Sequence, residues 1–299
     1  MPSNEQRRQA AKRKLERQLA NRAARARRRK LIAIISTAAA VVVVAGGIYL
    51  VTTLAHGNST ASAANSSTTT TPATTATGVP TNGPCKYTTT PSSPAPSGKD
   101  VGVPQDPNPT PKTGTVTVTL HTNLGDIPVT LDRAEAPCTV QSFVHLASSK
   151  YFDNTTCHRE TAYDTLKVLQ CGDPTGTGSG GPGYTIPDEN PKNLKAAPTT
   201  ANDTTDSTPE SIYPRGTIAM ANSGQANSGG SQFFIVYADS QLPPDYAVFG
   251  TVTPSGLKTL DKIAANGITP GTDPSTGQTT DQDGSPKQKV TIETAKVAS

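Results

Sequence analysis

The sequence MANSGQANSGGSQFFIVY, from Met220 to Tyr237, is the stretch that decides the fold of this chain. A loop of small residues rich in Asn and Gly runs directly into a segment with strand character. Alternate residues of a strand point to the same face, so Gln232 and Phe234 share one surface. An amide beside an apolar ring suits a groove that binds peptide backbone and proline together.

The same stretch resembles the signature of the cyclophilin family of peptidyl-prolyl isomerases, in which an M-A-N-x-G loop leads into G-S-Q-F-F-I. Other segments resemble further motifs of that family. His158-Arg159 resembles the family's H-R, and VLQCGD at 168–173 resembles hydrophobic-Q-G-G-D, with Cys171 where Gly is usual. GSGG at 178–181 resembles G-T-G-G, and YAVFG at 246–250 resembles H-x-V-F-G. The resemblance extends over roughly residues 115–295, more than half of the chain.

Alternation of apolar and polar residues predicts that this region is mainly β. It runs over 116–120 and again over 127–131, on either side of a short turn, which predicts a β-hairpin. Helical spacing predicts two helices, over 136–149 and 257–264. Many short strands with two helices favour a closed antiparallel β-barrel capped by the helices. The resemblance implies the same fold, with eight strands and two α-helices. Further strands are expected at 157–159, 167–171, 216–221, 232–237, 248–252 and 288–294.

The N-terminal segments predict a membrane anchor. Residues 1–30 carry twelve Lys or Arg against two Glu, a charge of +10, whereas the whole chain carries +4. The remainder is therefore mildly acidic, which argues against a nucleic-acid-binding domain. Residues 31–55 contain no charge and are long enough to span a bilayer as a transmembrane helix.

The cluster of positive charge places the basic tail 1–30 in the cytoplasm and everything after residue 55 outside. Two alternatives remain open. The apolar segment could be a cleavable signal peptide, since Ala61-Ser62-Ala63 has the form of a cleavage site. The tail could bind lipid headgroups or nucleic acid rather than only set the topology.

The composition divides the rest of the chain into a linker and one domain. Residues 56–112 are rich in Ser, Thr and Pro and predict a disordered linker, with ordered pieces possible near Cys85 and 101–103. The resemblance implies that residues 113–299 form a cyclophilin-like domain. Its segments 192–209 and 267–286 are polar and lack periodicity, so we expect surface insertions rather than parts of a site.

The four cysteines favour disulfides over a metal cluster, because their number is even and they follow the predicted membrane span. Three pairings are possible from the sequence, and free thiols remain an alternative. The resemblance implies that two of the cysteines lie on neighbouring strands. On that basis the pairs are Cys157 with Cys171 and Cys85 with Cys138.

The resemblance also implies the site residues. It implies that Arg159 is the catalytic residue and that Gln170 orients Arg159 and contacts the substrate backbone. The resemblance further implies the substrate-binding residues. They form the proline pocket, the loop 221–223 that contacts the substrate residues before the proline, and the adjoining walls. They are His158, Val168, Ala221, Asn222, Ser223, Gln232, Phe234, Leu242 and Tyr246.

Isomerisation of an Xaa-Pro bond needs no nucleophile, metal or cofactor. It needs a donor aimed at the prolyl nitrogen and a dry pocket for the ring, and the fixed donors and permanent charge of Arg suit that task. The four His residues show no zinc-binding spacing. We therefore expect no metal and no cofactor.

We expect a monomeric, membrane-anchored, extracytoplasmic isomerase that binds proline-containing polypeptides and assists their folding. Lys167 lies where the family usually has a pocket Phe, unless Leu166 or Tyr163 replaces it. This departure supports an alternative function, a proline-peptide binding module or holdase chaperone with the same fold and little turnover. An envelope scaffold is a third, weaker alternative.

Overall fold

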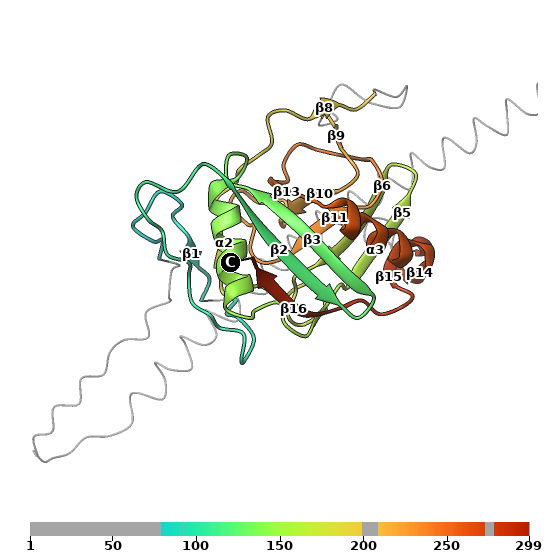
Figure 1. Cartoon of the computed structure of the whole chain (residues 1–299), viewed down its shortest axis with the longest axis horizontal. Coiled ribbons are helices and arrows are strands. Elements are labelled where there is room, and N and C mark those ends of the chain that lie inside the picture. Colours follow the sequence, from blue (N-terminus) through green and yellow to red (C-terminus); the bar gives the residue numbers. More distant parts are fainter. Residues whose placement is uncertain (1–78, 92, 199–208, 273–277, 299) are drawn as a thin grey trace, which may run out of the picture. The chain divides into compact units, whose positions relative to one another are not determined.

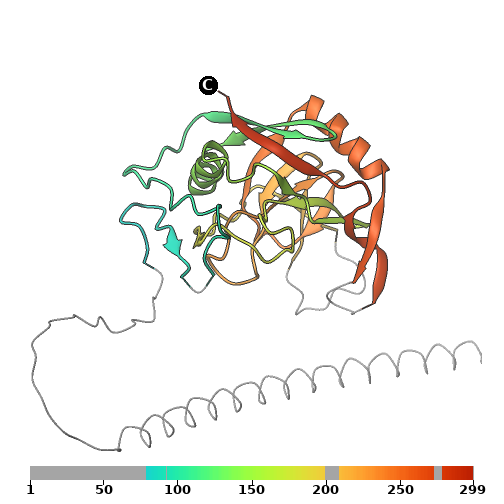
Figure 2. The same ribbon diagram turned by 90° about the horizontal axis from the view of Figure 1, so that it is seen from below.

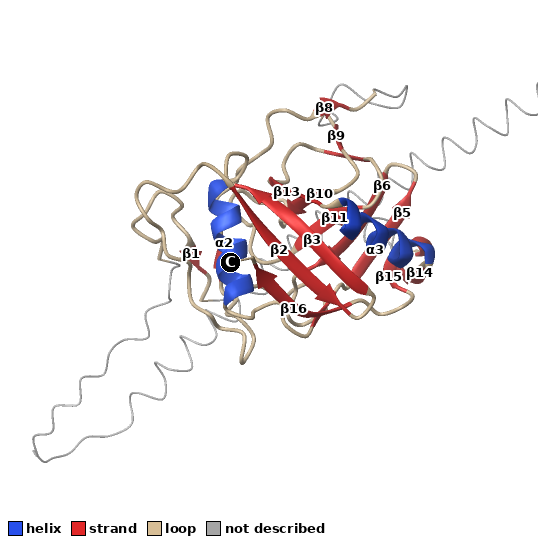
Figure 3. Cartoon of the chain, viewed as in Figure 1, coloured by secondary structure: helices blue, strands red, loops and turns tan. Residues whose placement is uncertain are grey.

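The structure is a computed structural model that describes residues 79–91, 93–198, 209–272 and 278–298. Two helices, α2 (Pro137–Ser148) and α3 (Pro254–Ala265), lie on opposite sides of the hairpin formed by β2 and β3 (Figures 1 and 3). The strands are β1 (Thr88–Thr89), β2 (Thr115–Thr122), β3 (Gly125–Asp132), β4 (Thr155–Thr156), β5 (Arg159–Tyr163), β6 (Leu166–Cys171), β7 (Tyr184–Thr185), β8 (Lys195–Ala196), β9 (Ser211–Tyr213), β10 (Thr217–Met220), β11 (Phe233–Val236), β12 (Ser240–Leu242), β13 (Val248–Val252), β14 (Ile268–Thr272), β15 (Thr279–Pro286) and β16 (Thr291–Val297).

The main sheet has eleven strands in the order β14-β15-β5-β6-β11-β10-β13-β3-β2-β16-β4, and every neighbouring pair is antiparallel. The expectation of a closed eight-stranded barrel is therefore corrected: the sheet is curled but open. Among the described residues its edge strands β14 and β4 do not pair with each other. The outer edge of β5 pairs with the β14–β15 hairpin, so this edge is not free to pair with β4. Two small sheets, β12-β9-β8 and β1-β7, lie outside it.

Local sequence explains both helices. Pro137 stands in the first turn of α2, where a missing N–H costs no hydrogen bond. Thr253 caps α3, because its hydroxyl accepts a hydrogen bond from Gly256 N–H, and Pro254 follows it. Helix α3 begins three residues before the range expected from apolar spacing, since Pro254, Ser255 and Gly256 add nothing to that spacing.

The strands β6, β10 and β11 are apolar on both faces. One face joins the main core and includes Leu169, Ile218 and Ile235. The opposite face forms a second, smaller cluster that includes Val168 and Phe234. Since neighbouring residues of a strand point to opposite sides, the pair Phe233-Phe234 serves both clusters. The second cluster supplies the apolar wall of the candidate site.

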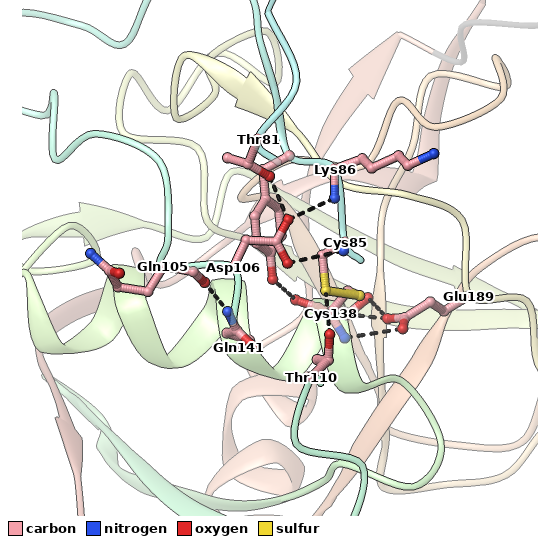
Figure 4. Close-up of a disulfide and its surroundings, with 11 residues drawn as sticks. Thr81, Cys85, Lys86, Gln105, Asp106, Thr110, Cys138, Gln141 and Glu189 are labelled. Atoms are coloured by element: carbon pink, nitrogen blue, oxygen red, sulfur yellow. Dashed lines mark hydrogen bonds between the residues drawn. A yellow bond between two sulfur atoms is a disulfide. The ribbon is translucent and has the colours of Figure 1, made fainter. Parts of the chain in front are cut away.

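Residues 79–91 and 93–112, the N-terminal strap, belong to the folded domain. Cys85 and Tyr87 are fully buried in the main core, and the Tyr87 hydroxyl donates to the Cys138 carbonyl over 2.8 Å. The Asp106 carboxylate accepts hydrogen bonds from the N–H groups of Cys85 and Lys86 (Figure 4). The strap lies on the same side of the domain as α2, and the β14–β15 hairpin lies on the far side (Figure 2).

The expectation of a disordered linker, with ordered pieces only near Cys85 and 101–103, is therefore corrected for residues 79–91 and 93–112, and the fold begins before residue 113. A buried Tyr and a disulfide offset the entropy of ordering a segment whose average composition is polar. The expected segments 1–30 and 31–55, and the linker up to residue 78, lie outside the described residues. Within the described part of the chain, no helix is long and apolar enough to cross a membrane.

All four cysteines form disulfides, Cys85 with Cys138 and Cys157 with Cys171. Both pairs are those that the resemblance implied, and the free-thiol alternative is wrong. Cys85–Cys138 joins the strap to the first turn of α2 (Figure 4). Cys157–Cys171 lies at the end of the β5–β6 pair, next to Arg159 and Gln170.

Candidate functional site

Two adjacent cavities lie over β6, β11 and the loop after β10. The smaller holds about 160 Å³ and the larger about 440 Å³. Gln170, Ala221 and Asn222 line both, so the cavities form one continuous site. The smaller cavity is lined by Arg159, Leu166, Val168, Gln170, Ala221, Asn222, Phe234, Leu242 and Tyr246. The larger one is bounded by residues 178–185, 221–223, 228 and 230–232, together with Thr90 and Ser93 of the strap.

Apolar side chains form most of the smaller cavity. Leu166 and Val168 stand on the same face of β6, and Phe234 projects from β11 beside them. The ring of Tyr246 meets that of Phe234 edge to face, with centroids 5.5 Å apart. A cavity of this size and character fits a small apolar ring better than a large ligand.

Lys167 does not line this cavity. Its ammonium group donates to the Asp164 carbonyl over 3.1 Å, on the opposite face of β6 from Leu166. Leu166 therefore occupies the wall for which the sequence left Leu166 or Tyr163 as candidates. The two-residue turn Asp164-Thr165 between β5 and β6 sets this register, because it pairs Tyr163 with Leu166.

Arg159 supplies the charge of the smaller cavity. Its Nε donates to Asp283 Oδ1 over 2.8 Å and its Nη2 to Asp283 Oδ2 over 2.7 Å. Its Nη1 donates to Gln170 Oε1 over a longer 3.4 Å. The hydrogen bonds that Arg159 donates to Asp283 raise the pKa of Arg159 above its ordinary value, against the effect of burial, so the guanidinium is always charged. N–H groups on Nη1 and Nη2 keep no partner among the described residues.

A relay of side-chain amides continues from Arg159 into the larger cavity. Gln170 accepts from Arg159 and donates through Nε2 to Gln232 Oε1 over 3.0 Å. Gln232 in turn donates to the carbonyls of Gly178 and Gly180, over 2.9 and 3.0 Å. Because the guanidinium can only donate and the carbonyls can only accept, the orientation of both amides is fixed.

The glycine loop at the end of this relay is held by Asp173. Its carboxylate accepts from Thr175 N–H and Oγ1 and from Gly178 N–H. Burial alone would raise the pKa of Asp173, but these hydrogen bonds outweigh burial and lower it below its ordinary value. Gly180 packs so closely that an added Cβ would lie 2.1 Å from Asp173 Oδ1, so a larger residue there would displace the Asp173 carboxylate.

His158 lines neither cavity. Its ring lies under Gly178, where an added Cβ would be 3.5 Å from His158 Cδ2. Burial lowers the pKa of His158, and its buried Nδ1 has no hydrogen-bond partner among the described residues. His158 and Arg159 point to opposite sides because they are neighbours on an extended segment, so the placement does not fit the predicted substrate contact of His158.

The loop after β10 presents its main chain to both cavities. Ala221 N–H donates to the Gln232 carbonyl over 2.9 Å, and Ser223 N–H donates to Ser228 Oγ over 3.0 Å. The Asn222 amide is tied down on both sides, by Gly224 N–H and by the Asp245 carbonyl. The N–H groups of Ala221 and Ser223 are thus already used in hydrogen bonds. A peptide in the groove would meet the main chain of Asn222, which lies between them.

The structure brings together all the predicted site residues except His158. Sequence reasoning missed Asp283, which lies in a segment without periodicity and is expected there only as part of a surface insertion. The described residues 268–272 and 279–286 form the largely exposed β14–β15 hairpin, in agreement with a surface segment, but the expectation that this segment has no part in the site is wrong for Asp283. It also missed Thr90 and Ser93, and no signal in the polar strap pointed to them. The described residues hold no cluster of His, Cys, Asp and Glu that could bind a metal.

Known proteins share this sequence pattern. The family described as cyclophilin type peptidyl-prolyl cis-trans isomerase/CLD matches residues 117–297. The chain is 49% identical over 195 residues to a probable peptidyl-prolyl cis-trans isomerase B of Mycobacterium leprae (strain TN), a match that covers 65% of this chain and 59% of that protein. It is 47% identical over 208 residues to a protein of the same description from Mycobacterium tuberculosis (strain ATCC 25618 / H37Rv), covering 70% and 62%.

The chain thus matches less than two thirds of the length of these mycobacterial relatives. A crystal structure of a cyclophilin type peptidyl-prolyl cis-trans isomerase from Cryptosporidium parvum is similar with a TM-score of 0.46 and 29% identity, covering 62% of this chain and 99% of that one. The family match, over residues 117–297, covers more than half of the 299 residues. This chain therefore belongs to the cyclophilin-type peptidyl-prolyl cis-trans isomerase family.

Proposed function

We propose that this chain is a peptidyl-prolyl cis-trans isomerase that acts on Xaa-Pro bonds of polypeptides. The observation that carries the proposal is a charged guanidinium at the wall of a proline-sized apolar cavity. Arg159 is held by hydrogen bonds and still has N–H groups to donate, while Leu166, Val168 and Phe234 surround the space beside it.

This arrangement fits the chemistry of the reaction. Rotation about a peptide bond faces a barrier of about 18 to 20 kcal/mol, because the nitrogen lone pair is delocalised into the carbonyl. A hydrogen bond from Arg159 to the prolyl nitrogen draws that lone pair away from the carbonyl and weakens the conjugation. The ring of the substrate proline is held in the smaller cavity, and the residues before it lie along Asn222 and the larger cavity. Each reduction of the barrier by about 1.4 kcal/mol raises the rate tenfold.

The alternative of a binding module with little turnover loses its main support. It rested on Lys167 in the place of an apolar wall, and Leu166 fills that wall while the Lys167 ammonium donates to Asp164.

The test is the rate of cis-to-trans exchange in a proline peptide, measured with the full chain and with Arg159→Ala. We expect catalysis by the full chain and a loss of about 100-fold in kcat/KM in the variant, as for other preorganised donors. Arg215→Ala is a matched control, because Arg215 forms a comparable ion pair with Asp261 on the surface. Exchange no faster than in buffer would refute the isomerase, and peptide binding without turnover would favour the module.

We further propose that the chain is anchored in the cell membrane by residues 31–55, with the catalytic domain on the extracytoplasmic side, where it assists the folding of other proteins. Two disulfides support an oxidising compartment. The basic residues before the apolar segment support a cytoplasmic N-terminus.

Protease treatment of intact cells tests this location. We expect the domain to be digested from outside while the chain fractionates with membranes. A domain that is protected until the cells are lysed, or that is released into the medium without residues 31–55, would refute the anchor as proposed. The folding role is tested by refolding a protein limited by proline isomerisation, with the Arg159→Ala chain as the control.

A further inference from the structure

Asp283 is the strongest partner of Arg159. Both of its carboxylate oxygens accept from the guanidinium, over 2.8 and 2.7 Å, and its side chain is 7% exposed, against 35% for Arg159. Two parallel charge-assisted hydrogen bonds fix the plane of a guanidinium as well as its position. The other contact, from Nη1 to Gln170 at 3.4 Å, is too long to hold that plane by itself.

The β14–β15 hairpin delivers this carboxylate to the site. Strand β15 pairs with β5 so that Asp283 lies opposite Thr161 and Gly284 opposite Glu160. Gly284 makes the close approach of the hairpin strands possible, because an added Cβ would lie 2.0 Å from the Thr269 carbonyl oxygen. The hairpin is thus built tightly enough to place Asp283 against β5.

We infer that Asp283 is a positioning residue for Arg159. By binding Nε and Nη2, it leaves Nη1 as the edge of the guanidinium that faces Gln170, and so aims the donor of Arg159 at the proline cavity. This inference rests on the proposed isomerase function. Its consequence is kinetic: fixing the donor before the substrate arrives favours the transition state, so Asp283 acts on kcat more than on KM.

The test compares Asp283→Asn with Asp281→Asn in the full chain. Asp281 lies two residues earlier on β15 and is exposed, so it is a matched control for the same chemical change. We expect Asp283→Asn to lower kcat about tenfold or more, as for other displaced catalytic groups, with KM changed less than about twofold. Asp281→Asn should leave both unchanged.

A double-mutant cycle separates positioning from other effects. If Asp283 acts through Arg159, adding Asp283→Asn to Arg159→Ala should lower the residual kcat no further. A normal or raised kcat in Asp283→Asn, or an equal loss in the Arg159→Ala background, would overturn this inference. An Arg159→Ala chain with full activity, or a wild-type chain with none, would instead refute the proposed function.

A readout without activity completes the test. In an NMR spectrum the Arg159 Nε–H of the wild-type chain should exchange slowly with solvent, and in Asp283→Asn it should exchange rapidly. The melting temperature shows whether the hairpin has loosened. A loss of kcat accompanied by a lower melting temperature and unchanged exchange at Nε–H would mean a structural role only, and would also overturn the inference.

Discussion

At the scale of single residues, the site depends on which atoms donate and which accept hydrogen bonds. Arg159, Gln170 and Gln232 form one directed relay that ends on the carbonyls of Gly178 and Gly180. Each amide in it has one donating and one accepting end, and both ends are used. A change that removes one end should therefore disturb the whole relay, although it alters only a few atoms.

Gln232→Glu tests the relay. A carboxylate cannot donate to two carbonyls, so the variant places like partial charges against each other beside the site. We expect kcat/KM to fall about tenfold, which corresponds to about 1.4 kcal/mol for the hydrogen bonds lost. Gln225→Glu, at an exposed position of the adjacent loop, is the control and should be unaffected. Equal activity of the two variants would contradict the prediction.

Glu160 is a second residue with a measurable effect. It is 1% exposed, its Oε2 has no hydrogen-bond partner among the described residues, and burial raises its pKa from 4.5 to about 7. Between these two values the folded chain keeps a proton that the unfolded chain has released. The stability of the fold should therefore fall as the pH rises from about 5 to 7.

Glu160→Gln should remove this dependence. We expect the variant to match the wild type near pH 4 and to exceed its free energy of unfolding by up to about 3 kcal/mol at pH 8. Urea denaturation across this pH range measures it. Glu135→Gln, at an exposed position, should keep the wild-type slope. If Glu160→Gln keeps that slope as well, Glu160 does not titrate as described.

At the scale of elements, the pattern of apolar residues in the sequence predicted most strands and helices that build the core. The β2–β3 hairpin, α2, and the strands β6, β10, β11 and β13 lie where the pattern indicated. The β14–β15 hairpin escaped prediction, because its residues are mostly exposed and polar and it is held by pairing with β5 rather than by an apolar stripe. The strap was not predicted either, because it has no apolar stripe: a disulfide and one buried Tyr hold it.

The two disulfides should contribute unequally. Cys85–Cys138 spans 53 residues and Cys157–Cys171 spans 14, and a longer loop loses more entropy in the unfolded chain when it is closed. We expect replacement of the first pair by Ser to cost about 1 kcal/mol more than replacement of the second, within a total of about 2 to 4 kcal/mol each. Equilibrium denaturation of the two double variants measures this difference, and the reverse order would contradict it.

At the scale of the whole molecule, the folded domain is larger than its sequence resemblance. Family motifs extend over roughly residues 115–295, whereas the core is completed by Cys85 and Tyr87 and the larger cavity by Thr90 and Ser93. The strap therefore links the folding of the domain to the shape of its site. Any fragment cut at the predicted boundary of residue 113 lacks both contributions.

Truncation tests this boundary. A chain of residues 79–299 should melt at the temperature of the domain in the full chain. A chain of residues 113–299 should melt lower, because it loses a buried Tyr, worth about 1.5 to 3 kcal/mol, and one disulfide. Carrying Cys138→Ser in the shorter chain removes the effect of an unpaired thiol. Equal melting temperatures of the two chains would show that the strap does not stabilise the domain.

The sequence by itself determined the family, the strands that bury an apolar face and most residues of the groove, because these depend on local patterns and short motifs. Only the tertiary structure decided that the sheet stays open, that Leu166 rather than Lys167 lines the smaller cavity, and that Asp283 binds Arg159. Each of these depends on strand register or on pairing between distant segments. Such pairing between Arg159 and Asp283, 124 residues apart, leaves no periodic signal in either segment.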